Sequence, residues 1–536
     1  MAKRKAGRPP APPPGRRFPE WFPHALGLAV LAIAIYANSV PNGFVGDDQF
    51  QLLRNPLITD PGKIPQILGS SVWAFLGLPG NYYRPLQFLV YLLLYQCAGF
   101  HAAAFHLFMV LLHAGNTVLL FLLVRRLAAG RVALAAAALF AAHPIHTEVV
   151  DWIAALPDLM LTTLVLAGVL VLVRQGAAPR GWQIFGHCAC YLLALLTKET
   201  GVMLLPLYAG FGFFYLGRRW SEFRRNAGLY AAMMAAFGVY LAMRGNALGG
   251  LAPGQQSFIH LGPEGFALSV VVTAAQYVAA LLFPADLNYF HVFHPTHAVT
   301  VEFLFSAMAL AALAALLLRS RTPLIAYGVF WMAAAIAPPL NLTGVGPNVF
   351  AERYLYLPSA GFCWIAGWAW DWLAGRRLLW ARTVGAVVLL ACALKAMARN
   401  RDWRDNFTMV QITVRQSPTA GWVHDALASE YVERDAFDQA LEHERLAVRY
   451  DPDVALFQMK LGYLLMRNDP RAAIAAFEKV VALEPAAAKG HCDLGMAFEA
   501  AGDLQQAARE YERALQLQPQ LREAQEGYRR ASAGLR

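Results

Sequence analysis

Charged residues are scarce in this chain of 536 residues, since Asp, Glu, Lys and Arg together make up 15% of it. A soluble domain of this size carries about a quarter charged residues, so these charges are too few to cover a water-facing surface. Hydrophobic residues account for 57% of the sequence, and the mean hydropathy is +0.40. This composition excludes a soluble enzyme, and it also excludes a disordered or fibrous chain.

Cysteine is sparse as well. The 6 cysteines lie mostly in apolar runs, and no two of them have the CxxC spacing of a metal site. The sequence also lacks a Walker phosphate loop, a GxGxxG motif after a strand, and a Ser-His-Asp motif. These absences exclude a disulfide framework, and they disfavour ATP-driven transport and soluble-nucleotide chemistry.

The formal net charge of +10 does not indicate a nucleic-acid partner, because no basic stripe with interleaved aromatic residues lies outside the apolar runs. In a membrane protein, basic residues instead gather on cytoplasmic loops. Residues 1–23 form a basic, proline-rich arm that is predicted to be disordered in the cytoplasm. The apolar stretch after it lacks a convincing A-x-A cleavage site, so it is predicted to be a transmembrane helix and not a signal peptide.

Residues 24–397 hold a series of apolar runs, several of them short for the roughly 20 residues that a bilayer requires. If every run except 264–284 crosses, the segments on the cytoplasmic side hold 20 Lys and Arg residues. The opposite loops up to residue 357 hold only Arg54, Lys63, Arg84, Lys198, Arg244 and Arg353. This asymmetry predicts about eleven crossings, with residues 264–284 interfacial or re-entrant and the C-terminus outside.

Four prolines divide the tail. Pro418, Pro452, Pro485 and Pro519 recur at spacings of 34, 33 and 34 residues. Between them, small residues at the eighth and twentieth positions of each unit let two helices approach, and aromatic residues fill the gap. Residues 418–536 are therefore predicted to be three tetratricopeptide repeats with a capping helix after residue 520, and residues 398–417 a linker. Such stacks bind peptides or partner helices.

Polar residues gather on one predicted face of the membrane domain. Five extracytoplasmic loops carry them. The first loop holds GFVGDD at 43–48 and YYRP at 82–85. The other four hold HPIHTE at 143–148, KET at 198–200, NYFH at 288–291 and ERYLY at 352–356. Ionisable groups at membrane depth are costly and by default mark a site or a pathway. The sequence therefore predicts one extracytoplasmic cavity.

The adjacent carboxylates Asp47 and Asp48 are the candidate catalytic pair, either as general base or as ligands of a cation. Arg84, Lys198 and Arg353 suit a phosphate at the membrane surface. A base beside a phosphate clamp at headgroup level predicts transfer from a lipid-linked phosphate donor. Further residues predicted to line the cavity or contact substrate are Tyr83, His143, His146, Glu148, Glu199, Glu352 and Tyr354.

Structural alternatives stand beside these roles. Asp47 and Asp48 can cap the first helix of their loop. His143, His146 and Glu148 have a spacing that can ligate a divalent metal, although such histidines more often hydrogen-bond within a polar cavity. A divalent metal is therefore an open alternative, and no other cofactor is predicted.

The neighbouring charges and aromatic residues have structural alternatives too. Lys198 and Glu199 can form an ion pair at a helix end, and Glu352 and Arg353 can pair to hold two loops together. Tyr354 can be an ordinary interface aromatic.

The chain carries, in this order, GFVGDDQF, NYYRPLQF, AAHPIHTEVVDWIAALPDLM, LLTKETGV, AERYLYLPSAGF and ARNRDWRD, and then the repeats. This order resembles that of the transmembrane and tetratricopeptide repeat-containing O-mannosyltransferases and their bacterial relatives. The resemblance covers nearly the whole chain after residue 24. It implies an all-α fold, a GT-C-type transmembrane helical bundle followed by a tetratricopeptide α-solenoid, with kinship to protein O-mannosyltransferases.

Members of the GT-C superfamily use a polyprenyl-phosphate sugar, invert the anomeric centre and carry an acidic motif in the first extracytoplasmic loop. The resemblance therefore implies that Asp47 is the general base, with Asp48 close behind, and that Arg84, Lys198 and Arg353 hold the donor phosphate. It also implies an in-plane helix that begins near Arg84. Three repeats, short loops and an Ala- and Arg-rich composition indicate a bacterial member, whose lipid carrier would be undecaprenyl phosphate.

Two functions from different classes follow. The leading prediction is an integral-membrane glycosyltransferase that moves a sugar from a polyprenyl phosphate to an extracytoplasmic hydroxyl. Its acceptor would be a polypeptide or an envelope glycan presented by the repeats. The alternative is a non-catalytic membrane scaffold whose repeats recruit envelope partners and whose cavity binds lipid without turnover. Either protein would lie in the inner membrane, with its N-terminus cytoplasmic and its repeats periplasmic.

Overall fold

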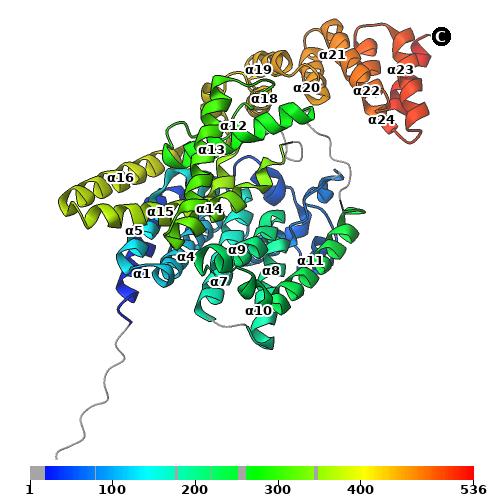
Figure 1. The fold of residues 1–536 in the computed structure, drawn as a ribbon. Helices are drawn as coiled ribbons and strands as arrows, with labels where there is room; N and C mark the ends of the chain where they lie inside the picture. Colours follow the sequence, from blue (N-terminus) through cyan, green and yellow to red (C-terminus); the bar gives the residue numbers. More distant parts are fainter. Residues whose placement is uncertain are drawn as a thin grey trace, which may run out of the picture.

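The computed structural model describes residues 19–78, 80–175, 179–217, 219–251, 261–342 and 348–535. Within these ranges every regular element is a helix, so the chain is all-α as predicted. Figure 1 shows a bundle of long helices and, at its C-terminal end, a curved row of shorter helix pairs. Residues 1–18 of the predicted arm lie outside the described residues.

The helices of the bundle are α1 (Phe22–Tyr36), α2 (Ile64–Leu68), α3 (Pro85–Ala98), α4 (Ala102–Leu127), α5 (Gly130–Ala142), α6 (Thr147–Asp151), α7 (Leu156–Gln175), α8 (Gly181–Thr197), α9 (Leu204–Gly210), α10 (Arg219–Arg225), α11 (Ala227–Leu248), α12 (Pro263–Leu282), α13 (Val301–Arg319), α14 (Pro323–Ile336), α15 (Tyr356–Ala374) and α16 (Leu378–Arg399). Prolines open α3, α12 and α14, because the first turn of a helix does not need their missing N–H. The helix implied near Arg84 is α3.

In the described part of the chain, seven helices are long and apolar enough to cross a membrane, or eight if the bent pair Gly130–Ala142 and Pro144–Asp151 is one span. The chain is therefore a multi-pass membrane protein. The predicted count of eleven crossings is not confirmed, because α8 and α14 have only 17 and 14 residues. Residues 264–284 fall on α12, whose 20 residues are apolar enough to cross, and their interfacial placement stays a prediction.

Glycines set the closest helix contacts in the bundle. A Cβ atom on Gly367 of α15 would lie 2.7 Å from the carbonyl oxygen of Val132 in α5. A Cβ atom on Gly361 of α15 would lie 2.8 Å from the carbonyl oxygen of Gly328 in α14. In a bilayer, helices associate through such van der Waals contact between backbones, so α15 packs between α5 and α14 with its backbone against both.

The repeats consist of α18 (Gly421–Val432) and α19 (Phe437–Tyr450), α20 (Ala455–Met466) and α21 (Pro470–Leu483), α22 (Ala488–Ala500) and α23 (Leu504–Leu517), and the capping helix α24 (Arg522–Gly534). A Cβ atom on Gly462 would lie 2.6 Å from the Phe477 ring, and one on Gly495 would lie 2.9 Å from the Tyr511 ring. The eighth position must therefore be small because an aromatic ring occupies the space beside it. The predicted repeats are confirmed.

Residues 398–417, predicted to be a linker, are packed against both parts. They contain the end of α16, a single turn, and α17 (Asn406–Gln416). Trp403 is 1% exposed. It belongs to one buried hydrophobic cluster with Val45, Trp152 and Val423. The first repeat is therefore joined to the bundle by a buried segment.

Replacing Gly367 with alanine is expected to lower the free energy of unfolding by on the order of 1–3 kcal/mol, because the added methyl group overpacks the contact between α15 and α5. Gly228→Ala on α11 is the matched control, since a Cβ atom there meets nothing within 4 Å. Thermal unfolding of both variants in detergent measures the difference. Equal midpoints for the two variants would contradict this close contact.

Candidate active site

A cavity of about 640 Å³ lies where the loops meet the ends of the bundle helices. Small-molecule sites commonly have volumes of roughly 300–1,000 Å³. Its polar and aromatic wall consists of Asp47, Gln51, Trp73, Asn81, Tyr82, Arg84, Trp152, Asp158, Lys198, Glu199, Thr200, Arg244, Tyr289, Phe290, Asn348, Arg353 and Tyr354. The α17–α18 segment also contributes, with Val410, Trp422, Val423 and Ala426. The cavity is thus bounded by both the bundle and the first repeat.

The two adjacent acids of the first loop have different surroundings. Asp48 is fully buried, and its carboxylate accepts hydrogen bonds from the backbone N–H of Val45 at 3.1 Å and of Ala154 at 2.7 Å. Burial raises the pKa of Asp48 well above its usual value, although these two hydrogen bonds lower it in part. Asp48 does not cap a helix; it ties the first loop to the turn before α7.

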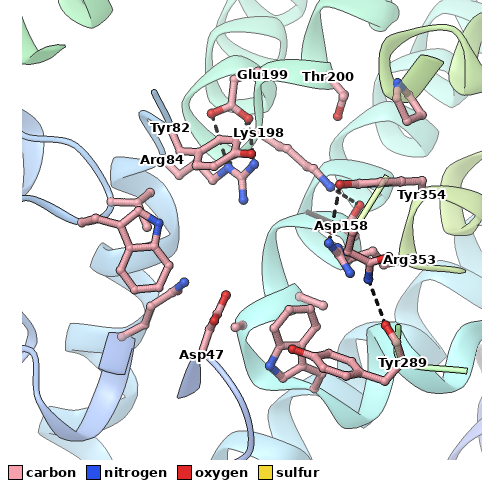
Figure 2. Close-up of a pocket in the computed structure, with 18 of the residues that line it drawn as sticks. Asp47, Tyr82, Arg84, Asp158, Lys198, Glu199, Thr200, Tyr289, Arg353 and Tyr354 are labelled. Carbon is pink, nitrogen blue, oxygen red and sulfur yellow. Dashed lines mark hydrogen bonds and ion pairs between the residues drawn. The ribbon is translucent and has the colours of Figure 1, made fainter. Parts of the chain in front are cut away.

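Asp47 instead faces the cavity. Its carboxylate has no hydrogen-bond or ion-pair partner among the described residues, and Figure 2 shows it across the open space from Arg84, Lys198 and Arg353. Burial raises the pKa of Asp47, and the charges of Arg353 and Arg84 offset that shift only in part. An unpaired carboxylate with a raised pKa in a cavity has the properties of a general base.

Each of the three predicted cations is paired with an acid from another segment. Arg84 Nη2 lies 3.0 Å from Glu199 Oε2, and Arg84 Nε also donates to that oxygen. Although burial raises the pKa of Glu199, the charge of Arg84 holds it below its usual value. This contact fixes the start of α3 against the loop after α8.

The other two cations are held in the same way. Lys198 Nζ lies 2.6 Å from Asp158 Oδ1, and Arg353 Nη1 lies 2.6 Å from Glu148 Oε1. The alternative in which Lys198 pairs with its neighbour Glu199 is therefore corrected. Adjacent side chains leave the backbone in different directions, and a nearer acid lies on another segment.

Arg244 of α11 is a cavity residue that the sequence did not single out. It is 8% exposed, and its Nη2 donates to the backbone oxygen of Asn81 at 2.7 Å and to Asn81 Oδ1 at 2.5 Å. Its Nη1 is buried without a hydrogen-bond partner in the ranges that the structure describes. The available signal was its place among the few basic residues on the predicted extracytoplasmic side.

Five of the predicted cavity residues do not line the cavity, and that part of the prediction is corrected. Tyr83 is buried and its hydroxyl donates to the backbone oxygen of Leu68 at 2.7 Å. Glu148 lies behind Arg353, and Glu352 pairs with Arg399 at 3.0 Å instead of with Arg353. These groups, like His143 and His146, bond to other buried groups and not to the cavity. Tyr354 lines the cavity as predicted, and the side chain of Lys198 lies over its ring.

The three candidate metal ligands do not converge. The rings of His143 and His146 lie 5.7 Å apart. His143 Nε2 contacts the backbone oxygen of Leu281 at 3.0 Å, and His146 Nε2 contacts Ser359 Oγ at 2.8 Å. Among the described residues, no group of three or more His, Cys, Asp or Glu side chains is arranged to hold a metal ion.

Residues 488–521, the third repeat, match the family model of the tetratricopeptide repeat. Protein O-mannosyl-transferase F38B6.6 of Caenorhabditis elegans is 24% identical over 472 residues, which cover 82% of this chain and 65% of the relative. Protein O-mannosyl-transferase TMTC4 of Mus musculus is 23% identical, with coverage of 80% and 66%. Protein O-mannosyl-transferase Tmtc1 of Drosophila melanogaster is 35% identical over 187 residues, which cover 34% of this chain and 22% of the relative.

The chain is similar to the protein O-mannosyl-transferases. The predicted resemblance is thereby confirmed. The chain spans less than two thirds of the length of these O-mannosyl-transferases. Among solved structures, ArnT from Cupriavidus metallidurans bound to undecaprenyl phosphate aligns with 91% of this chain and 79% of its own, at 15% identity and a TM-score of 0.40.

In this relative of the O-mannosyl-transferases, Asp48→Ala is expected to destabilise the fold and Asp47→Ala to leave its stability nearly unchanged. Asp48→Ala leaves the buried N–H groups of Val45 and Ala154 without an acceptor, which lowers the free energy of unfolding by about 1–3 kcal/mol for each group. The midpoints of thermal unfolding in detergent test this. A loss of stability in Asp47→Ala as large as that in Asp48→Ala would contradict the division of roles between the two acids.

Proposed function

We propose that this chain is an integral-membrane glycosyltransferase. In this proposal it moves a sugar from a polyprenyl-phosphate donor to an extracytoplasmic hydroxyl and inverts the anomeric centre. The observation that carries the proposal is the unpaired carboxylate of Asp47, which faces a group of buried cations in one cavity. Similarity to protein O-mannosyl-transferases over about four fifths of the chain supports the reaction class.

The proposed reaction is a single displacement. The acceptor hydroxyl transfers its proton to Asp47 while its oxygen forms a bond to the anomeric carbon. The bond between that carbon and the phosphate oxygen breaks, and the oxygen leaves with the electron pair. Because attack and departure occur on opposite faces of the sugar, the configuration inverts.

The cations would stabilise the departing phosphate, where negative charge develops. Arg84, Lys198, Arg244 and Arg353 all line the cavity. The structure gives Arg84 Nη1 and Arg244 Nη1 no hydrogen-bond partner among the described residues. The nearest acid to Arg244 Nη1 is Glu199, whose Oε1 lies 3.9 Å away, so an added anion would compete only with this long ion pair. A phosphate bound there would sit between the two guanidinium groups, beside Glu199.

The place of the cavity favours a lipid-linked donor. Asp158 lies near the start of α7, and Lys198 directly follows α8, so the cavity lies at the ends of apolar helices. A phosphate at the level of the headgroups would reach these cations while its polyprenyl chain stayed in the bilayer. This arrangement supports the predicted polyprenyl-phosphate donor. In a bacterial member the proposed carrier is undecaprenyl phosphate.

The first repeat forms the wall of the cavity at which we propose that the acceptor binds. Trp422, Val423 and Ala426 of α18 line the cavity opposite the bundle. A polypeptide bound along the inner helices of the repeats would therefore reach Asp47 without leaving the protein surface. We infer a Ser or Thr hydroxyl on a polypeptide as the acceptor, with an envelope glycan as the alternative that an acceptor panel would reveal.

Asp47→Asn is expected to lower the transfer rate by on the order of 10²–10⁴, since it removes the base. Transfer of labelled sugar from a panel of polyprenyl-phosphate donors to a periplasmic extract measures this, with and without EDTA to detect a need for a divalent cation. Asp48→Asn is the matched control. Its single amide oxygen can accept from only one of the N–H groups of Val45 and Ala154, so thermal unfolding checks that this variant stays folded. Full activity in Asp47→Asn would overturn the assignment of the base. A wild type that turns over no donor while its repeats retain a partner would favour the scaffold.

The pH dependence of kcat/KM is expected to report the raised pKa of Asp47. The carboxylate is the active form, so the rate falls as the pH drops through this pKa, which lies above that of an ordinary aspartate. A profile of kcat/KM against pH, from acidic to neutral conditions, would show an acidic limb that reports a single protonation. The residual activity of Asp47→Asn should lack that limb, and a limb that persists in the variant would assign it to another group.

A further inference from the structure

Asn406, the first residue of α17, contacts two parts of the chain that are far apart in sequence. Its Oδ1 accepts a hydrogen bond from the backbone N–H of Gly46 at 2.7 Å, and its Nδ2 donates to Glu430 Oε1 at 2.5 Å. Gly46 directly precedes Asp47, and Glu430 belongs to α18 of the first repeat. We propose that Asn406 is a positioning residue that fixes the turn bearing Asp47 to the first repeat. This inference rests on the proposed role of Asp47 as the base.

The turn depends on contacts at both of its ends. Gly46 has a φ of +55°, in the left-handed region that favours glycine. On one side of Asp47, Gly46 is held by Asn406, and on the other side Asp48 is held by Val45 and Ala154. Asp47 itself has no partner in the described part of the chain. Its direction is therefore set by its two neighbours, and Asn406 holds one of them.

The amide of Asn406 is itself held on the side of the repeat. Arg434 Nη1 donates to Glu430 Oε2 at 2.7 Å, and the guanidinium of Arg434 lies 4.2 Å from the centroid of the Phe407 ring. Glu430 is thereby fixed where it accepts from Asn406. The amide of Asn406 accepts from Gly46 with its oxygen and donates to Glu430 with its nitrogen, so alanine loses both contacts and an ionised aspartate cannot make the second.

The same helix also forms part of the cavity wall. Ala426 lines the cavity, and Glu430 follows it by one turn on the same face of α18. The first repeat therefore provides both a wall for the acceptor and a support for the base. In this arrangement the catalytic unit includes α17 and α18 in addition to the bundle.

Other contacts keep the loop folded when Asn406 is replaced. The N–H of Gly43 donates to the backbone oxygen of Arg404 at 2.8 Å, and Asn42 Nδ2 donates to the backbone oxygen of Asn400 at 2.9 Å. Neither contact involves Asn406. Asn406→Ala should therefore release the turn at Gly46 without detaching the first loop.

The kinetic test uses the full-length protein with Asn406→Ala. Gln411→Ala on the same helix is the matched control, because it also removes an amide, and the Gln411 side chain makes no hydrogen bond within the described ranges. Asn406→Ala is expected to lower kcat on the order of 10- to 100-fold, since a small misplacement of a reacting group is costly. The KM for the donor should stay unchanged. In an Asp47→Asn background, Asn406→Ala should cause no further loss, because the base that it positions is already gone. An equal loss in both backgrounds would overturn the positioning role.

Hydrogen exchange provides a readout that needs no activity. The Gly46 amide is expected to exchange faster in Asn406→Ala than in Gln411→Ala, because its acceptor is lost. Unchanged exchange would overturn the contact. Full activity in Asn406→Ala together with loss of activity in Asp47→Asn would refute this inference alone, whereas full activity in Asp47→Asn would refute the proposed base.

Discussion

A charge that is withdrawn from water needs a partner, and this requirement shapes the end of the bundle where the loops meet. Arg84 with Glu199, Lys198 with Asp158, and Arg353 with Glu148 form ion pairs at 3.0, 2.6 and 2.6 Å. Each pair joins segments that are distant in the sequence. Losing one member of a buried pair leaves an uncompensated charge, at a cost of about 3–5 kcal/mol. The pairs therefore fix the cations in space and hold the loops around the cavity.

Asp47 differs from the other acids of the cavity, because every cation near it is already engaged elsewhere. Arg84 is paired with Glu199 and Lys198 with Asp158. Arg353 is paired with Glu148. If these acids were absent, the cations would be free to pair with Asp47 and lower its pKa. The paired acids thus preserve a carboxylate whose pKa is raised by burial. The proposed base and the proposed anion site can then coexist in one small cavity.

The sequence predicted features that depend on local pattern. Proline spacing and small residues such as Gly462 and Gly495 identified the repeats, and polar clusters in the predicted extracytoplasmic loops identified Asp47 and the cations. It could not predict features that depend on the packing of distant segments. Lys198 pairs with Asp158, which lies 40 residues away, and not with its neighbour Glu199. Nothing local distinguishes Asp47 from Asp48, because the difference arises from the N–H of Ala154 beside Asp48.

Residues 398–417 show why a polar segment can be a rigid connection. The sequence prediction for these residues is a linker. In the structure, Arg399 donates to Thr147 at 2.9 Å and to the backbone oxygen of Leu287 at 2.6 Å, and it pairs with Glu352. All three nitrogens of the Arg399 guanidinium are thereby engaged, and a buried polar group that is fully satisfied makes a connection stiff and specific. The position of the first repeat relative to the cavity is therefore set by folding, so the acceptor proposed to bind the repeat would meet the proposed base at a fixed distance.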